Sequence, residues 1–232
     1  EGMRSKISLF CNVRESDVIQ EIDVPTTIYE VPLDLQKHGL DSAVVNHLEL
    51  PSVAKVDMSD WQDLVTRWAN PKHEIEIAVV GKYIELHDAY KSIYESLAHA
   101  GAAHNTKVRF RKIAAESLLD CDASEALKGI NGILIPGGFG ERGLEGKINA
   151  VQWARENNIP TFGICFGMQA ITIEYARNVA GIKDANTSEV DENSANPVID
   201  LMAEQEDVSD KGGTMRLGAY ACRVVPNTKL AD

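Results

Sequence analysis

The segment of the sequence that is best suited to chemistry runs from Gly163 to Gly167 and reads Gly-Ile-Cys-Phe-Gly. It lies between an apolar segment typical of a buried strand and an amphipathic helical segment. Small residues on both sides of a nucleophile permit the strained strand-to-helix turn that exposes it. We therefore predict that Cys165 is a nucleophile at a helix N-terminus, where a thiolate is stabilised. A structural cysteine buried between two glycines is the simpler alternative.

A second glycine-rich segment, Pro136–Gly143, follows another short apolar segment. Its spacing fits the dinucleotide pattern G-x-G-x-x-G, but it follows about the third strand and lacks the acid expected roughly 20 residues later. Two adjacent glycines, Gly137 and Gly138, instead allow a backbone N–H to turn toward an anion. The N–H groups of Gly138 and Phe166 would then form an oxyanion hole. The alternative is an ordinary glycine-rich turn.

A cysteine that attacks an acyl group normally needs a histidine base. Every histidine of the chain precedes Cys165, and each is more typical of a surface or helix position: His38, His47, His73, His87, His99 and His104. If the base comes after the nucleophile in the fold, we expect it to lie outside these 232 residues.

Strand and helix patterns alternate from about residue 75 onward. The predicted strands are 74–82, 107–113, 132–136 and 160–165, of which 132–136 is fully apolar and 160–165 is likewise expected to be buried. The first predicted helix begins at a cap, Asp88, and ends at Gly101. Two further helices are predicted from apolar stripes, the first formed by Leu144, Ile148, Val151 and Ala154 and the second by Met168, Ile171, Tyr175 and Val179. This order predicts an α/β fold with a mostly parallel sheet flanked by helices.

Residues 1–72 differ from the rest of the chain. We predict strands at 6–11 and 26–32, and a helix capped by Ser59 that carries Trp61, Leu64, Val65 and Trp68. Pro71 then interrupts the helical pattern. Two strands are a thin core, so we expect residues 1–72 to be the end of one domain and residues 73–232 to form another.

Composition narrows the class of protein further. The chain is 44% apolar and 25% charged, with a net charge of −12. An acidic surface repels a phosphate backbone, and no run of about 18 apolar residues occurs, so we expect neither nucleic-acid binding nor a membrane span. The four cysteines are widely spaced, which predicts no zinc site or disulfide framework and a reducing, cytoplasmic location.

The two glycine-rich segments resemble the class I glutamine amidotransferases, and further segments resemble the CTP synthase family among them. These segments are Lys6–Val13, Gly81–Leu86, Asp88–Ser92, Ala185–Glu189 and Gly212–Gly218. The resemblance covers essentially the whole chain. It implies that residues 1–72 are the C-terminal part of the synthetase domain with a linker, and that residues 73–232 are a class I glutaminase domain truncated before its C-terminal end.

The resemblance implies an enzyme that makes CTP from UTP, ATP and ammonia cut from L-glutamine, with Mg and ATP in the synthetase half, GTP as activator, and a homotetrameric assembly. It also implies roles for individual residues: Cys165 forms a glutamyl thioester, Gly138 and Phe166 donate to the oxyanion, Gly167, Met168 and Gln169 line the glutamine pocket, Glu189 holds the substrate ammonium, and Lys6 contacts the pyrimidine nucleotide.

The chain departs from the family in one important respect: it ends ahead of the His-Pro-Glu segment that completes the catalytic triad. We therefore expect the chain alone to be nearly inactive and to bind no cofactor or metal by itself. Two alternatives stay open. One is a non-catalytic assembly module of the same fold. The other is a different cysteine-elbow α/β hydrolase, which would usually need an acid on an early strand or a histidine directly after the cysteine, where Phe166 stands.

Overall fold

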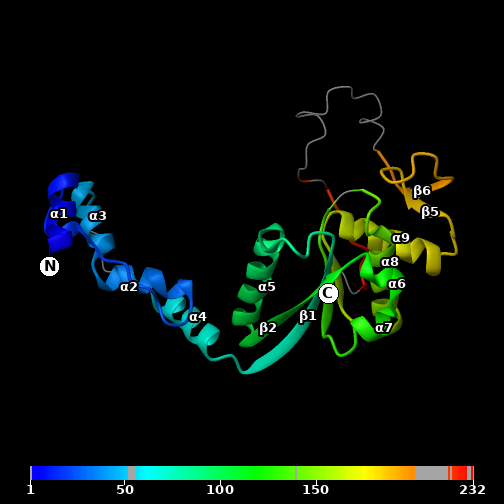
Figure 1. Ribbon diagram of the computed structural model, residues 1–232, viewed down its shortest axis with the longest axis horizontal. Coiled ribbons are helices and arrows are strands. Elements are labelled where there is room, and N and C mark those ends of the chain that lie inside the picture. The colour runs from blue at the N-terminus through cyan, green and yellow to red at the C-terminus, as the bar shows by residue number, and fades with distance from the viewer. Residues whose placement is uncertain are drawn as a thin grey trace.

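A computed structural model describes residues 2–51, 56–138, 140–201, 219, 221–228 and 231. The segment Gly212–Gly218, which contributed to the resemblance, lies outside these residues. Within the described part of the chain, no helix is long and apolar enough to cross a membrane. Figure 1 shows a helical N-terminal region, in blue, that lies to one side of a sheet with its helices.

The predicted parallel sheet is present. Its strands are β1 (His73–Gly81), β2 (Thr106–Ala114), β3 (Gly132–Ile135) and β4 (Thr161–Gly163). They are hydrogen-bonded in the order β2-β1-β3-β4, and every pair is parallel. One expectation was wrong: β4 is not a buried strand, and Phe162 is 64% exposed. β4 lies at the edge of the four-stranded sheet, so its outer flank has no neighbouring strand in that sheet.

Helices cover both faces of the sheet, as predicted, because side chains alternate along each strand. Val79 of β1 packs on one face with Tyr90 of η3 (His87–Tyr90) and Tyr94 of α5 (Lys91–Ala103). Ala78 and Val80 point to the other face. That face is covered by α6 (Ser117–Asp120), α7 (Ala123–Ala126) and α8 (Leu144–Glu156).

Helix α8 buries the face that was predicted, whereas α9 (Phe166–Asn178) buries a different face from the predicted one. The four residues of the predicted α8 stripe are all buried. On α9 the expected stripe is largely wrong, because Met168, Tyr175 and Val179 are about half exposed. The buried face instead carries Phe166, Ala170, Ile173 and Glu174. Both stripes are apolar at helical spacing, so periodicity alone could not choose between them.

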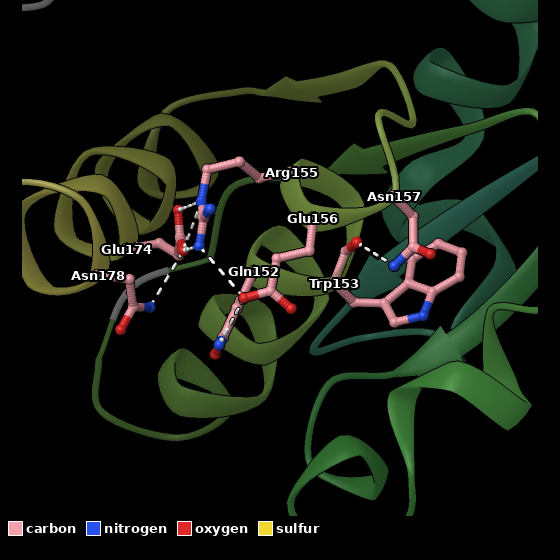
Figure 2. Close-up of polar contacts among 7 residues, drawn as sticks. All are labelled: Gln152, Trp153, Arg155, Glu156, Asn157, Glu174 and Asn178. Carbon is pink, nitrogen blue, oxygen red and sulfur yellow. Dashed lines mark hydrogen bonds and ion pairs between the residues drawn. The ribbon is translucent and has the colours of Figure 1, made fainter.

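A charged contact joins α8 to α9 on the side shown in Figure 2. Arg155 of α8 donates from Nε and Nη2 to Glu174 Oε1 of α9, at 3.0 and 2.8 Å. Asn178 Nδ2 donates to the same oxygen at 3.0 Å. The Glu174 side chain is only 1% exposed. A buried carboxylate therefore has its partners supplied by both helices, which fixes their relative position.

The N-terminal region is helical, and both predicted strands were wrong. It consists of α1 (Gly2–Cys11), η1 (Glu15–Asp17), η2 (Ile28–Glu30), α2 (Val31–Lys37), α3 (Leu40–His47) and α4 (Ser59–Ala69). A strand needs a neighbouring strand to satisfy its backbone N–H and C=O groups, whereas a helix satisfies them locally. No strand is described among residues 2–51 and 56–72, so the helix satisfies the backbone there.

Several predicted helix ends shift by a few residues. Ser59 is the first residue of α4 and not its cap: the N-cap residue is Met58, and the Ser59 N–H donates to Asp57 Oδ1 at 2.9 Å. Asp88 lies within η3, not at a cap. Gly101 lies inside α5, not at its end, and glycine is required there because a Cβ would lie 2.4 Å from the Thr106 carbonyl oxygen.

An aromatic cluster docks the N-terminal region on α5. Trp61 Nε1 donates to the Tyr29 carbonyl oxygen at 2.7 Å, and the Tyr29 hydroxyl donates to Glu95 Oε2 at 2.8 Å. The rings of Trp68 and His99 both lie 5.0 Å from the Tyr29 ring. Burial, together with Glu95, raises the pKa of Tyr29 to about 12. The hydroxyl therefore stays protonated and keeps donating across the physiological range.

Candidate active site

Cys165 occupies the joint between β4 and α9, and its backbone has the strain of a nucleophile elbow. Its φ is 55° and its ψ is −115°, a conformation that residues with a side chain rarely adopt. It is the N-cap residue of α9, and its side chain is exposed. Such strain persists only where the surrounding structure imposes it, and it concentrates at functional sites. The turn predicted from the sequence is therefore present.

The flanking glycines are required by close backbone contacts. A Cβ at Gly163 would lie 2.5 Å from the carbonyl carbon of Gly167. A Cβ at Gly167 would lie 2.0 Å from the carbonyl oxygen of Ile135, at the end of β3. Neither contact is tolerable, so only glycine fits at the two positions. The G-x-C-x-G spacing thus lets α9 start directly against the ends of β3 and β4.

Backbone hydrogen bonds fix the elbow from both sides. The Ile164 N–H donates to Ile135 O at 2.9 Å, and the Met168 N–H donates to Cys165 O at 2.9 Å. Phe166 is the first residue of α9, so its N–H has no acceptor within the helix. This N–H lies next to the thiol in the chain, where an oxyanion formed on attack by Cys165 would need a donor.

The glycine-rich turn after β3 lies directly against Cys165. A Cβ at Gly137 would be 3.4 Å from Cys165 Cβ and 3.8 Å from Cys165 Sγ. The next residue, Gly138, has a φ of +131°, which favours glycine. β3 and β4 are parallel neighbours, so their carboxyl ends meet at one edge of the sheet. The structure thus brings together the two segments that the sequence singled out.

Glu189 reaches the same turn from a segment that is distant in sequence. It follows β5 (Ala185–Thr187), which pairs in parallel with β6 (Asn196–Ile199) in a separate two-stranded sheet. Its Oε1 accepts a hydrogen bond from the Gly140 N–H at 3.1 Å. An exposed carboxylate is therefore held beside the glycine-rich turn, where it can meet a positively charged group of a ligand.

The other predicted site residues lie in different surroundings. Gln169 of α9 has a buried Oε1 without a hydrogen-bond partner among the described residues. Met168 is half exposed beside it in the chain. Lys6 lies on α1, at the opposite end of the molecule from α9. The structure does not bring Lys6 to the Cys165 site.

Sequence reasoning missed two features of the site. The buried Tyr90 hydroxyl accepts from the N–H groups of Lys82 and Tyr83, at 3.1 Å each, and so shapes the turn after β1. Lys147 of α8 is completely buried, and its Nζ lies 4.9 Å from the centre of the Phe166 ring. A lysine normally indicates a surface position. Its spacing of three residues from the buried Leu144 was the signal that could have found it.

No base or metal cluster accompanies the nucleophile in the described part of the chain. His87 contacts Lys112 and stacks on Tyr94, whereas His99 contacts Tyr29. Among these residues no three His, Cys, Asp or Glu side chains are arranged to hold a metal ion.

Two sequence families match the chain. The model of the family described as glutamine amidotransferase class-I matches residues 85–230. The model described as CTP synthase N-terminus matches residues 1–50. The first match covers more than half of the chain and includes the elbow, the glycine-rich turn and Glu189.

Curated relatives extend this similarity to the whole chain. A CTP synthase of Caldanaerobacter subterraneus subsp. tengcongensis is 53% identical over all of this chain and 43% of the relative. A CTP synthase of Flavobacterium psychrophilum is 51% identical over 98% of this chain and 42% of the relative. The chain therefore spans less than half the length of these relatives.

A solved structure supports the same assignment. It is the Trypanosoma brucei CTPS glutaminase domain with bound acivicin, which is 41% identical and superimposes with a TM-score of 0.52. The match covers 56% of this chain and 50% of that one. The chain belongs to the class-I glutamine amidotransferase family, and its similarity to the CTP synthases extends from its first residue to its last.

Proposed function

We propose that this chain carries the glutaminase nucleophile of a glutamine-hydrolysing CTP synthase, with Cys165 as the attacking residue. The observation that carries the proposal is the strained backbone of Cys165, held between two obligatory glycines and directly against the glycine-rich turn. The similarity to CTP synthases over the full chain supports the choice of reaction. It also argues against a different cysteine-elbow hydrolase.

The proposed first step is acyl transfer to the thiol. Cys165 Sγ bonds to the amide carbon of glutamine, and the carbonyl oxygen becomes an oxyanion that accepts from the N–H groups of Gly138 and Phe166. The C–N bond then breaks, the nitrogen takes up the proton that the Cys165 thiol has released and leaves as ammonia, and a glutamyl thioester remains. Water later attacks the thioester and releases glutamate.

Substrate recognition is proposed for the residues around this turn. Glutamine is zwitterionic, so its ammonium needs a carboxylate, and Glu189 is positioned beside the glycine-rich turn by Gly140. Gln169, in the first turn of α9, is proposed to contribute to the same pocket. Gly167 and Met168, at the first turn of α9, would line the same pocket.

The wider functions follow from similarity to the CTP synthases alone. We propose that ammonia from this site reaches a synthetase domain that converts UTP to CTP with Mg and ATP, that GTP activates the reaction, and that the enzyme is a cytoplasmic homotetramer. Residues 1–72 would belong to the synthetase domain, with Lys6 near the pyrimidine nucleotide, and residues 73–232 to the glutaminase domain.

We expect the 232-residue chain alone to turn over very little glutamine. None of its histidines follows Cys165. Two of those that precede it contact other side chains: His87 contacts Lys112, and His99 contacts Tyr29. Loss of a triad base typically lowers turnover by several orders of magnitude, although binding and the oxyanion hole remain.

The proposal is tested by covalent labelling with a chloromethyl ketone analogue of glutamine. All four cysteines are exposed, so Cys11, Cys121 and Cys222 are internal controls for accessibility. Peptide mass spectrometry should show Cys165 alkylated at least about tenfold faster than the other three, because the analogue is bound beside it. Equal labelling of all four would contradict the assignment and would favour a non-catalytic assembly module.

A further inference from the structure

We infer that a cavity between α4, α5 and β2 binds a small phosphate monoester that carries a flat aromatic ring. The cavity has a volume of about 410 Å³, which is within the usual range of small-molecule sites. Both regions of the chain line it, with Arg67 and Trp68 from α4, Ala98 and Ala102 from α5, and Lys107 and Phe110 from β2. The inference does not depend on the role proposed for Cys165.

The cavity lies at the opposite edge of the sheet from the candidate active site. Thr106, the first residue of β2, contributes to its wall and pairs with His73, the first residue of β1. Cys165 follows the carboxyl end of β4. Because the four strands are parallel, their amino ends and their carboxyl ends lie at opposite edges. A ligand in the cavity therefore occupies a site separate from the proposed glutamine site.

The charge of the cavity lining is the reverse of the charge of the chain. The sequence has a net charge of −12, yet the described residues that line the cavity include two cations, Arg67 and Lys107, and no Asp or Glu. By contrast, Arg109 of β2, which does not line the cavity, pairs with Glu74 at 2.7 Å. Two positive charges without a carboxylate beside them in the lining match the two negative charges of a phosphate monoester near neutral pH.

Arg67 provides the more specific part of this match. Its Nε is buried and has no hydrogen-bond partner among the described residues. A buried donor without an acceptor is rare in folded proteins and calls for a partner such as an ion. The planar guanidinium group suits the oxygens of a phosphate, which would supply the missing acceptor. The phosphate group therefore lies next to Arg67, and the exposed Lys107 adds the second positive charge.

Aromatic and aliphatic side chains make up much of the remaining wall. Trp68, Phe110 and Val108 line the cavity, and each is only partly buried by the protein. The Trp68 ring lies 5.0 Å from the Tyr29 ring, and the Phe110 ring lies 5.0 Å from the Tyr94 ring, so packing on neighbouring rings holds both in place. A flat ring bound here buries apolar surface against preformed aromatic groups. An anion without a ring cannot make these contacts.

The test is a titration of the 232-residue chain with phenyl phosphate, followed by calorimetry at about pH 8, where the phosphate is doubly charged. We expect a Kd of about 1 mM, as is reasonable for a ligand of this size. Inorganic phosphate lacks the ring and benzyl alcohol lacks the charge, so each should bind at least about tenfold more weakly. If either binds as tightly as phenyl phosphate, or if phenyl phosphate does not bind, the inference is wrong.

Two variants locate the binding site. Arg67→Met keeps an apolar stem and removes the guanidinium, and we expect it to weaken phenyl phosphate binding about tenfold through loss of a charged hydrogen bond. Arg109→Met is the matched control, because Arg109 lies on β2 outside the cavity lining, and it should leave the Kd unchanged. An Arg67→Met protein with native circular dichroism and wild-type affinity would overturn the inference.

A measurement on the wild-type chain covers the case in which Arg67→Met does not fold. The indole N–H groups of the tryptophans give separate signals in a nitrogen–proton NMR spectrum. Phenyl phosphate should shift the signal of Trp68, which lines the cavity, and leave that of Trp153 on α8 unchanged. An unchanged Trp68 signal, or equal shifts of the two signals, would refute the inference.

Discussion

At the scale of single residues, the proposed nucleophile has the most strained backbone of the site. Cys165 has a side chain at a φ of 55°, and the glycines on either side cannot be replaced without a backbone clash. Strain of this kind costs on the order of 1–3 kcal/mol. The rest of the fold offsets this free-energy cost, and the strained turn leaves the thiol exposed at a helix N-terminus.

This strain predicts an unusual order of stability for two variants. Alanine at position 165 keeps the Cβ and hence the strain, whereas glycine removes both. We expect Cys165→Gly to have a free energy of unfolding about 1 kcal/mol higher than Cys165→Ala, the reverse of the usual order. Urea denaturation of the two proteins measures the difference. A more stable Cys165→Ala protein would show that the elbow is relaxed.

Lys147 predicts a pH-dependent stability with a definite sign. Its pKa is about 8 in the folded chain against 10.5 for an ordinary lysine, so between these values the unfolded chain binds more protons. The free energy of unfolding of wild type should therefore rise relative to that of Lys147→Met as pH increases from 8 to 10.5. The expected rise is about 3 kcal/mol. Parallel stability curves for the two proteins would contradict a buried, protonated lysine.

Individual residues also show where prediction from sequence ends. Cys165 and its glycines could be recognised because their types and spacing have one chemical use. Lys147 was missed because a lysine is normally placed at the surface, and only the folded chain shows that α8 buries it together with Leu144, Gly146 and Ile148.

At the scale of secondary-structure elements, the active-site edge depends on how α8 and α9 are held together. Phe166, Ala170 and Ile173 of α9 pack with Leu144 and Ile148 of α8. The Arg155–Glu174 contact lies at the far end of α9 from Cys165 and fixes the rotation of the helix (Figure 2). The elbow is therefore positioned by an element that is anchored at both of its ends.

Removal of this anchor should weaken the fold measurably. Arg155→Met leaves the carboxylate of Glu174 buried without its charged partner, which typically costs about 3–5 kcal/mol. Urea denaturation should show a loss of that order. Glu156→Gln, at an exposed carboxylate 3.5 Å from Arg155, is the control and should change stability by less than about 0.5 kcal/mol. Equal effects of the two substitutions would contradict a structural role for the Arg155–Glu174 pair.

The elements also differ in how far the sequence could predict them. β1 and β3 were recognisable because a buried parallel strand is a short apolar run between turns. The N-terminal strands were not, because Lys6–Cys11 forms a strand only if another strand pairs with it, and the described chain provides a helix instead. The exposure of Phe162 depends on strand order, which a local pattern does not contain.

At the scale of the whole molecule, two regions meet at one aromatic contact. α4 ends at Ala69 and β1 begins at His73, so a short connection joins the two regions. Across it, the N-terminal region contacts α5 through Tyr29, which donates to Glu95, and through Trp68, whose ring lies beside His99. This contact should limit local opening of the connection and thereby slow its cleavage by proteases.

Limited trypsin digestion tests that contact, because Lys72 lies in the connection. Tyr29→Phe keeps the ring but removes the hydroxyl that donates to Glu95. We expect cleavage after Lys72 to become about threefold faster, since local opening is easier. Tyr175→Phe, on the exposed face of α9, is the control. Identical cleavage rates for wild type and Tyr29→Phe would show that the hydroxyl contact does not restrain the connection.

The central claim is that Cys165 is the nucleophile of a glutamine site, and protection by substrate tests it most directly. The chain is treated with the glutamine chloromethyl ketone in the presence of excess L-glutamine or excess D-glutamine, and labelling of each cysteine is measured by peptide mass spectrometry. We predict that L-glutamine slows labelling of Cys165 at least about fivefold, that D-glutamine has little effect, and that labelling of Cys11, Cys121 and Cys222 does not change. If Cys165 is labelled at the same rate without glutamine, with L-glutamine and with D-glutamine, the central claim is contradicted.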